Sequence, residues 1–473
     1  MRIQRPSCKI APGPWFTNAA LLLLGLGLLG LAKQLIMEFH HFTLGFSGVA
    51  GWSVLLYLLS AAVILKLPTN KFTLLLVISF GIAFRLVTLL PEPFMSSDVY
   101  RYVWDGVVQH AHSSPYRYVP GDPALSFLRS PNQNLFDHIN RRDYARTIYP
   151  PVAQWLFYLV TWFNASVTFM KLAMILFEGA TVYALMELLE SLGRRREEIL
   201  LYAWCPLLVW EIGSSGHLDS AAIAFIALAL LARLRQKPVA TGLFLGAAIL
   251  IKFYPLVLLP ALWQKRDFKM PLAIAGLTAF SYACYARVGL LVFGFLGGYV
   301  QEEGVQSGAR YFLLQLIQRL PGLQHTPTTL YLGTMLLGFS LLAYWSSKRG
   351  SSQSGQLEAS FWTRSFSLPE NASFLPGALF LSFALMIAFS PHYPWYVAWL
   401  IPFGVLLPNT PLFAYTLGLF YLSSTPLGAG TLESQYRLNC FLYASVSLFI
   451  ALEVAIRIWR DRKVLSKATP EYV

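Results

Sequence analysis

Long apolar runs separated by short polar breaks cover most of this chain. A run of about 20 residues is long enough to cross the hydrocarbon core of a bilayer as an α-helix. The runs lie at 15–38, 47–66, 72–90, 167–190, 198–213, 219–233, 240–251, 255–264, 270–287, 328–346, 374–390, 395–407, 411–426 and 439–459. Although several of them are short, the pattern predicts an all-α, polytopic transmembrane protein with about 12–14 spans.

Three interruptions of this pattern shape the expected architecture. Residues 91–166 form a long loop, within which the short apolar stretch 149–163 predicts an interfacial helix along the membrane surface rather than a further span. The runs on either side of Lys252 and Pro255 are compatible with two spans or with one broken hairpin. The Ser-rich stretch 347–371 predicts a flexible linker.

The basic residues indicate how the chain is oriented. The net charge is +13, and most basic clusters fall between apolar runs on one side of the expected membrane, namely 66–71, 194–196, 233–237, 265–269, 348–349 and 457–463. Basic loops remain in the cytoplasm, so we expect cytoplasmic N- and C-termini and an external loop 91–166. This distribution accounts for the positive charge without a nucleic-acid partner.

The stretch Ser97–Gly106 is unusually dense in charged and aromatic residues for this chain. Four of its polar side chains are spaced to share one face of a helix, namely Asp98, Arg101, Tyr102 and Asp105. We expect Ser97 to cap this helix and Gly106 to end it. Two carboxylates, a guanidinium and a phenol on one side of a short helix predict a polar site at the membrane surface.

Three other polar groups fall on the same outer side when the charge rule is applied. The four groups together are 98–118, 213–220, 252–255 and 391–396. Each alone also fits a structural role: a simple salt bridge, a helix cap, a lysine that snorkels from a helix end, or a proline turn. Their convergence favours function, because ionisable residues that face a shared cavity near a membrane are candidates for a functional site.

The order of these motifs carries a family resemblance. The motifs are Asp98-x-Tyr100-Arg101-Tyr102-x-Trp104-Asp105-Gly106, Ser114-Pro115-Tyr116-x-Tyr118-x-Pro120, Tyr149-Pro150-Pro151, Gly193-Arg194-Arg195, Gly216-His217-Leu218-Asp219-Ser220, Lys252-x-Tyr254-Pro255 and His392-Tyr393-Pro394-Trp395-Tyr396. In this order they resemble the GT-C superfamily of integral-membrane glycosyltransferases that use polyprenyl-phosphate sugars. The closest resemblance is to the bacterial polyprenol-phosphate-mannose-dependent mannosyltransferases and to the first mannosyltransferase of GPI-anchor synthesis.

The resemblance implies a role for each candidate residue. Asp98 corresponds to the catalytic base of the first outer loop, with Asp105 as a second carboxylate. The expected substrate-binding residues are Arg101, Tyr102, Arg146, His217, Asp219, Lys252, Tyr254, His392 and Tyr393. Many relatives carry two adjacent acidic residues where this chain has Ser97-Asp98-Val99-Tyr100, so we expect no cofactor and no metal. A divalent metal between Asp98 and Asp105 is the alternative.

The implied activity is that of an inverting glycosyltransferase in a bacterial inner membrane. It would move a sugar, mannose by resemblance, from a polyprenyl-phosphate donor to a lipid or glycan acceptor on the outer face, with membrane lipids as its surroundings. A transporter or flippase of lipid-linked sugars is the alternative, although such proteins place their sites at the midplane, often between repeated halves. A non-catalytic scaffold is a third possibility.

The expected domains follow from the spans and the motifs. Residues 1–71 form an added N-terminal transmembrane hairpin, and residues 72–346 form the GT-C catalytic core with its outer loop 91–166. The linker 347–371 then connects this core to a C-terminal transmembrane bundle over 372–473.

Overall fold

The computed structural model describes residues 13–37, 45–349, 356–357, 366–428 and 430–468. The described chain is helical apart from two short strands, β1 (Gln356–Leu357) and β2 (Phe366–Ser367), which pair antiparallel. Most of the expected linker 347–371 lies outside the described residues. The expectation of an all-α, polytopic membrane protein is confirmed.

Seven described helices contain segments long and apolar enough to cross a membrane, or eight if one bent pair forms a single span. The helices are α1 (Pro14–Met37), α2 (Gly45–Lys66), α3 (Lys71–Leu89), α8 (Val167–Ser191), α17 (Thr328–Arg349), α18 (Leu375–Phe389) and α21 (Leu432–Ala468). The bent pair is α14 (Lys269–Ala283) with the residues Ala286–Glu302, which turn by 110°. This number is below the expected 12–14, because several apolar runs fold as shorter or broken helices.

The shorter helices form the middle of the bundle. Here α11 (Asp219–Leu234) packs against α8 and against α12 (Pro238–Ile249), and α12 packs against α14. The apolar run expected at 198–213 is divided into η3 (Arg196–Ile199), α9 (Leu200–Ala203), α10 (Pro206–Leu208) and the π-helix η4 (Val209–Ser214). The run around Lys252 is broken as well, since α12 ends before it and η5 (Tyr254–Leu258) and α13 (Leu259–Leu262) follow.

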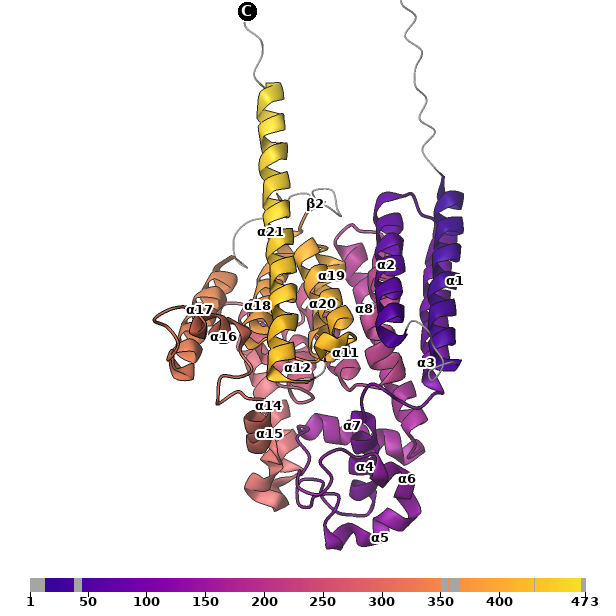
Figure 1. Ribbon diagram of the computed structural model, residues 1–473, viewed down its shortest axis with the longest axis vertical. Coiled ribbons are helices and arrows are strands. Elements are labelled where there is room, and N and C mark those ends of the chain that lie inside the picture. The colour runs from indigo at the N-terminus through magenta and orange to yellow at the C-terminus, as the bar shows by residue number, and fades with distance from the viewer. Residues whose placement is uncertain (1–12, 38–44, 350–355, 358–365, 429, 469–473) are drawn as a thin grey trace, which may run out of the picture.

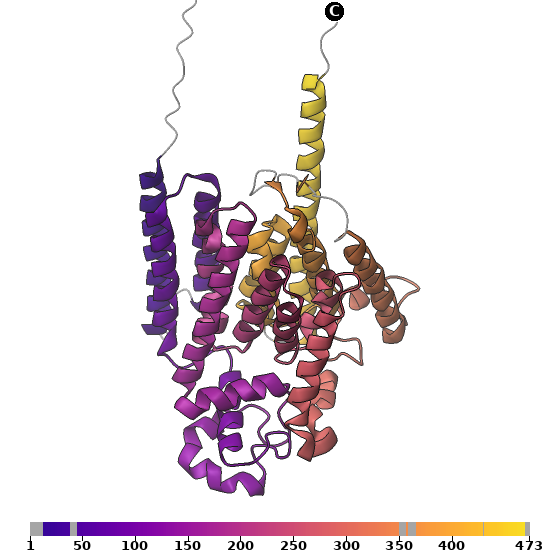
Figure 2. The same cartoon turned by 180° about the vertical axis from the view of Figure 1, so that it is seen from behind.

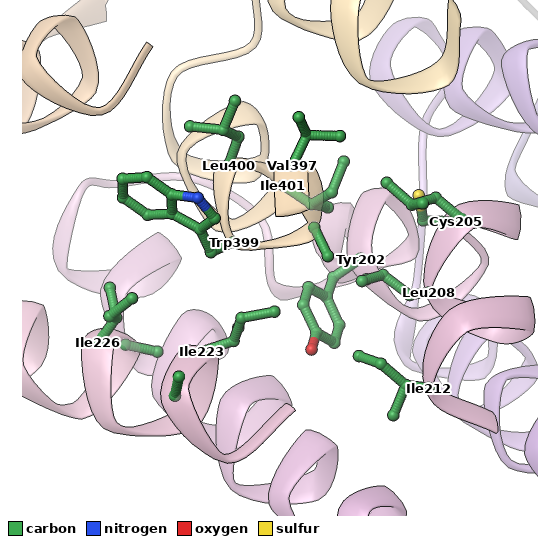
Figure 3. Close-up of a cluster of buried hydrophobic side chains, with 14 of the residues drawn as sticks. Tyr202, Cys205, Leu208, Ile212, Ile223, Ile226, Val397, Trp399, Leu400 and Ile401 are labelled. Atoms are coloured by element: carbon green, nitrogen blue, oxygen red, sulfur yellow. The ribbon is translucent and has the colours of Figure 1, made fainter. Parts of the chain in front are cut away.

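Figure 3 shows the core that these short helices create. Tyr202 of α9 lies between Ile212 of η4 and Ile223 of α11 in this view, and Trp399 of η8 (Pro394–Leu400) belongs to the same buried cluster. Trp399 is completely buried. The segment η8 thereby packs into the middle of the bundle, and α19 (Ile401–Leu406) and α20 (Thr410–Ser423) continue from it.

Charged side chains inside the bundle fix α3 against α8. The Arg85 guanidinium forms an ion pair with Glu178 at 2.7 Å, and both side chains are nearly inaccessible. Lys171 donates from Nζ to the carbonyl oxygens of Thr88 at 2.8 Å and Pro91 at 2.7 Å. These bonds satisfy carbonyls at the end of α3 and fix the point at which the outer loop leaves the bundle.

The outer loop folds into a helical module at one end of the bundle (Figures 1 and 2). Its elements are α4 (Asp98–His110), η1 (Pro123–Leu125), α5 (Ser126–Arg129), η2 (Ser130–Asn132), α6 (Gln133–Asp137) and α7 (Pro151–Phe163). The Pro14 end of α1 and the C-terminal end of α21 lie at the opposite end of the molecule. That the module is external and contacts the membrane through α7 stays a prediction.

The expected cap of α4 is confirmed in position only, and its expected end is wrong. Ser97 holds the N-cap position but makes no side-chain cap bond, and its Oγ accepts from the Asn140 side chain at 3.2 Å. Gly106 lies inside the helix, where a Cβ would overlap Thr161 and lie 2.7 Å from the Phe157 carbonyl oxygen of α7. The glycine therefore permits close packing of α4 on α7 rather than ending the helix.

The remaining elements complete one side of the bundle. They are η6 (Ala286–Phe293), α15 (Leu296–Glu302), α16 (Phe312–Gln318), η7 (Glu370–Ala372) and η9 (Pro426–Gly428). Figure 1 shows α14 and α15 continuing from the bundle down beside the outer module. This arrangement closes a space between the module, α15 and the ends of the middle helices.

Candidate active site

A cavity of about 410 Å³ lies at this junction, a size typical of small-molecule sites. It opens where α3, α12 and α18 have just ended. Its described lining is Met95–Asp98, Arg101, Asn140, Arg141, Ala145–Pro150, Ile251–Tyr254, Phe295, Leu296, Tyr299, Glu303, Tyr393, Trp395 and Tyr396. Three of the four polar groups expected on one side of the membrane therefore reach a single cavity, although nothing in their local sequence connects them.

Asp98 is the carboxylate at the first turn of α4. It is half-buried, and its Oδ1 accepts from the Asn140 side chain at 2.9 Å. No cation forms an ion pair with Asp98 among the residues that the structure describes, so its carboxylate remains available to a ligand in the cavity. Asn140 fixes the orientation of this carboxylate without removing its charge.

Asp105 does not share this cavity. Its side chain is completely buried, where Oδ1 accepts from Arg101 Nε at 2.7 Å and Oδ2 accepts from Gln154 Nε2 at 2.9 Å. Arg101 also donates to the carbonyl oxygen of Ala145 at 3.1 Å. Although the helical period places both carboxylates on one face of α4, Asp105 is already bonded to α7 and to Arg101 and does not converge with Asp98.

Lys252 lines the cavity from the break after α12. Its Nζ forms an ion pair with Asp219 Oδ2 at 2.5 Å, and Tyr254 donates a hydrogen bond to Asp219 Oδ1 at 3.3 Å. Asp219 is the first residue of α11 and is completely buried. The predicted substrate-binding residue Asp219 thus lies behind the wall of the cavity and fixes Lys252 and Tyr254, which line it.

Besides Arg101, two further arginines of the outer module line the cavity. Arg146 donates from Nε to the Arg117 carbonyl oxygen at 3.1 Å, and no carboxylate in the described part of the chain pairs with it. Arg141 instead pairs with Glu302 of α15 at 2.7 Å. Burial lowers the pKa of Arg141, but the hydrogen bond and charge of Glu302 outweigh burial and raise the pKa above its usual value.

An aromatic stack forms another part of the wall. Tyr393 stacks on Trp395 with ring centres 4.5 Å apart, and Trp395 stacks on His217 at 4.3 Å. His217 is completely buried, so it supports the wall from behind and does not line the cavity. Its Nε2 lies 3.3 Å from Glu211 Oε2, a buried carboxylate of the π-helix η4.

Two further predicted residues do not reach the cavity. Tyr102 is completely buried in the module, where its ring stacks on Phe157 with a centre distance of 4.9 Å. His392 precedes Tyr393 in the chain but is not one of the residues that line the cavity. Burial, followed by the charge of Arg310, lowers the pKa of His392 to about 4, so its imidazole is neutral at physiological pH.

Several cavity residues had no clear sequence signal. Glu303 and Tyr299 come from the glycine-rich stretch after α14, where the run Gln301-Glu302-Glu303 was the only polar indication. Asn140, which lines the cavity, is an isolated polar residue in a polar loop. Glu211, which is buried behind the cavity wall, is a lone acid in an apolar run. Glu211 could have been identified from the sequence as a candidate functional residue, because a carboxylate within an apolar run is rare.

The two carboxylates that the sequence suggested as metal ligands lie in different surroundings. Both carboxylate oxygens of Asp105 are bonded to Arg101 and Gln154, so this group cannot join Asp98 as a ligand without breaking those bonds. Within the described ranges, no three His, Cys, Asp or Glu side chains are grouped closely enough to hold a metal ion.

The fold and the cavity define a polytopic helical membrane protein whose polar cavity lies at one end of a helical bundle. The family model described as "Alpha-(1->6)-mannopyranosyltransferase, N-terminal domain" matches residues 20–264, which is more than half of the chain. The chain belongs to this family and is a GT-C-like mannosyltransferase. No curated protein and no solved structure matches it.

Proposed function

We propose that the protein transfers mannose, with inversion, from a polyprenyl-phosphate donor to a hydroxyl of a lipid or glycan acceptor on the outer face of the membrane. The observation that carries this proposal is the composition of the cavity. It combines an unpaired carboxylate, Asp98, with the cations Lys252 and Arg146 at the level where membrane helices end. An acceptor hydroxyl needs a base, and a departing phosphate needs positive charge.

In the proposed step, the acceptor oxygen attacks the anomeric carbon of the donor sugar as the bond from that carbon to the phosphate oxygen breaks. Asp98 takes the proton of the acceptor hydroxyl. A carboxylate is a weak base towards an alcohol, so the proton moves as the new bond forms rather than before it. A single displacement of this kind inverts the configuration at the anomeric carbon.

The released phosphate gains negative charge, which Arg146 and Lys252 are placed to neutralise. The Nε of Arg146 is fixed on the Arg117 carbonyl oxygen, which leaves its other donors for two phosphate oxygens. Lys252 lies between Asp219 and the cavity, with 16% of its side chain exposed. The proposal therefore assigns neutralisation of the leaving group to side chains rather than to a divalent ion.

The donor's lipid chain would leave the cavity beside Phe253. This residue lines the cavity and is 43% exposed, and Leu256 on the following turn is 53% exposed. Both follow directly after α12, so an apolar chain leaving here would meet the bilayer. The donor's phosphate would remain at the rim of the bundle while its chain stays in the lipid.

The test is transfer from polyprenyl-phosphate mannose by the purified protein and by Asp98→Asn. We expect the wild type to form a mannosylated product with the opposite anomeric configuration. The Asp98→Asn variant should bind the donor normally but transfer about 10²–10⁴-fold more slowly, the usual contribution of acid–base catalysis. Donor movement across vesicles without product would support a flippase, and full activity of Asp98→Asn would remove this base from the mechanism.

A matched measurement addresses the metal. Transfer in the presence of EDTA should remain close to its untreated rate, since Arg146 and Lys252 carry the phosphate charge in this proposal. Loss of activity in EDTA that is restored by added Mg²⁺ or Mn²⁺ would show that a divalent ion takes over this task.

A further inference from the structure

The stretch 294–310 forms a wall of the cavity that lies outside the matched range 20–264. It contributes Tyr299 of α15 and the carboxylate of Glu303. Glu303 pairs with Arg310, and the two side chains are 9% and 8% exposed. The cavity thus contains a second carboxylate besides Asp98. It comes from a different element and, unlike Asp98, has a cation as its partner.

This wall is fixed to the outer module. Gly294 has a φ of 53°, and its backbone passes so close to Thr147 that a Cβ there would overlap the carbonyl oxygen. The amide of Phe295 donates to that same oxygen at 3.3 Å. The pair between Arg141 and Glu302 adds a third connection. These contacts therefore fix the position of Glu303 relative to the cavity residues of the outer module.

Tyr396 connects Glu303 with the proposed phosphate-binding residues. Its ring centre lies 5.4 Å from Lys252 Nζ and 5.6 Å from the Arg310 guanidinium, and its hydroxyl bonds the hydroxyl of Tyr299. A carboxylate and two phenols therefore lie next to the cations. Such groups accept and donate hydrogen bonds in the way that sugar hydroxyls require.

We infer that Glu303, with the hydroxyls of Tyr299 and Tyr396, binds neighbouring hydroxyls of a pyranose ring in this cavity. The inference rests on the proposed function and deepens it. A carboxylate can accept several hydrogen bonds at once, so Glu303 can retain Arg310 and still accept from a diol. Arg310 also neutralises the carboxylate, which would otherwise repel the phosphate of the donor.

Two sugars could occupy this position, namely the transferred sugar of the donor and the terminal sugar of the acceptor. Both present the same diol chemistry, and the experiment separates them. The probes are a short-chain prenyl-phosphate mannose as donor and methyl α-mannoside as acceptor. The variant is Glu303→Gln, and the matched control is Glu433→Gln, which alters an exposed carboxylate that pairs with Arg319 and does not line the cavity.

We expect Glu303→Gln to weaken binding of one probe by about tenfold to a hundredfold, as for the loss of a hydrogen bond to a charged group. The other probe should bind as before, and Glu433→Gln should change the binding of neither probe by more than about twofold, since exposed ion pairs contribute little. A probe that lacks the ring hydroxyl bound by Glu303 should bind the wild-type protein more weakly, by a similar factor. The same probe should bind Glu303→Gln no more weakly than it binds the wild type.

A purely structural role for Glu303 predicts different results. Its variant would then lower the thermal midpoint and affect both probes equally, without dependence on any ring hydroxyl, and this outcome overturns the inference. The double variant Glu303→Gln/Arg310→Gln removes the pair without leaving an unpaired charge, so it replaces the single variant if the latter fails to fold. Because the readout is binding, it remains informative if the wild type fails to transfer mannose, which would refute only the proposed function.

Discussion

Replacing Asp105 should destabilise the protein, whereas replacing Asp98 should inactivate it. The two carboxylates lie on one face of α4, two turns apart, and the sequence alone assigns both to the reaction. The structure separates them, because Asp105 is completely buried with both oxygens bonded and Asp98 is half-buried and faces the cavity. The perturbation that exploits this difference is Asp105→Ala.

The expected magnitude follows from what the alanine leaves behind. Arg101 is only 8% exposed on its side chain, so its guanidinium would keep a single bond, to the Ala145 carbonyl oxygen, and lose its counter-charge. Gln154 would lose an acceptor as well. Removing one partner of a buried ion pair destabilises a protein by about 3–5 kcal/mol. Asp105→Asn retains the shape and one acceptor, so its effect should be smaller.

The assay compares thermal unfolding and mannosyl transfer in detergent. The control is Asp137→Asn, which removes a half-exposed pair with Arg142 in the same module and should change stability by less than about 1 kcal/mol. Asp105→Ala should unfold at a clearly lower temperature, and the activity of the fraction still folded should exceed that of Asp98→Asn. An unchanged midpoint with abolished transfer would refute this reasoning and return Asp105 to the active site.

Three further predictions follow. Gly106→Ala should lower stability by about 1–3 kcal/mol through overpacking of α4 on α7, whereas Gly179→Ala, where a Cβ meets nothing, should raise it slightly on the same thermal assay. Arg146→Gln should weaken donor binding at least tenfold with little change in the midpoint, as measured by titration. Burial lowers the pKa of His392 in the folded state to about 4, so below pH 6.5 the unfolded state binds more protons than the folded state. Stability should therefore fall as the pH falls, by about 2 kcal/mol at pH 5. In pH-dependent melts His392→Gln should remove this loss, and a matched change at the exposed His325 should not.

The sequence predicted the common location of the cavity residues because one physical rule acts on them all. The charge rule assigns an expected orientation to every span, and that expectation places Asp98, Lys252 and Tyr393 on the same side. The rule says nothing about which side chains face inward there. Asp105 and His217 were expected at the site for the same reason as Asp98, yet contacts distant in sequence hold them behind its wall.

The number of spans was predicted less well, and the reason is local. Apolar composition identifies a segment that avoids water, but a segment buried inside a bundle has the same composition as one that crosses a bilayer. Residues 198–213 are apolar and buried, yet Pro206 and the π-helix that follows divide them into short helices. The helices α11 and α12 are similarly surrounded by others, so their length is set by packing rather than by membrane thickness.

Ion pairing separates the cations around the cavity into two kinds. Arg101, Arg141 and Lys252 already have carboxylate partners, whereas Arg146 has none among the described residues. A phosphate that enters can gain the full attraction of Arg146, but it must compete with Asp219 for Lys252. That competition suits a site that has to release its product. In the proposed reaction, the guanidinium of Arg146 holds the departing lipid phosphate, while Lys252 can return to Asp219 once that phosphate leaves.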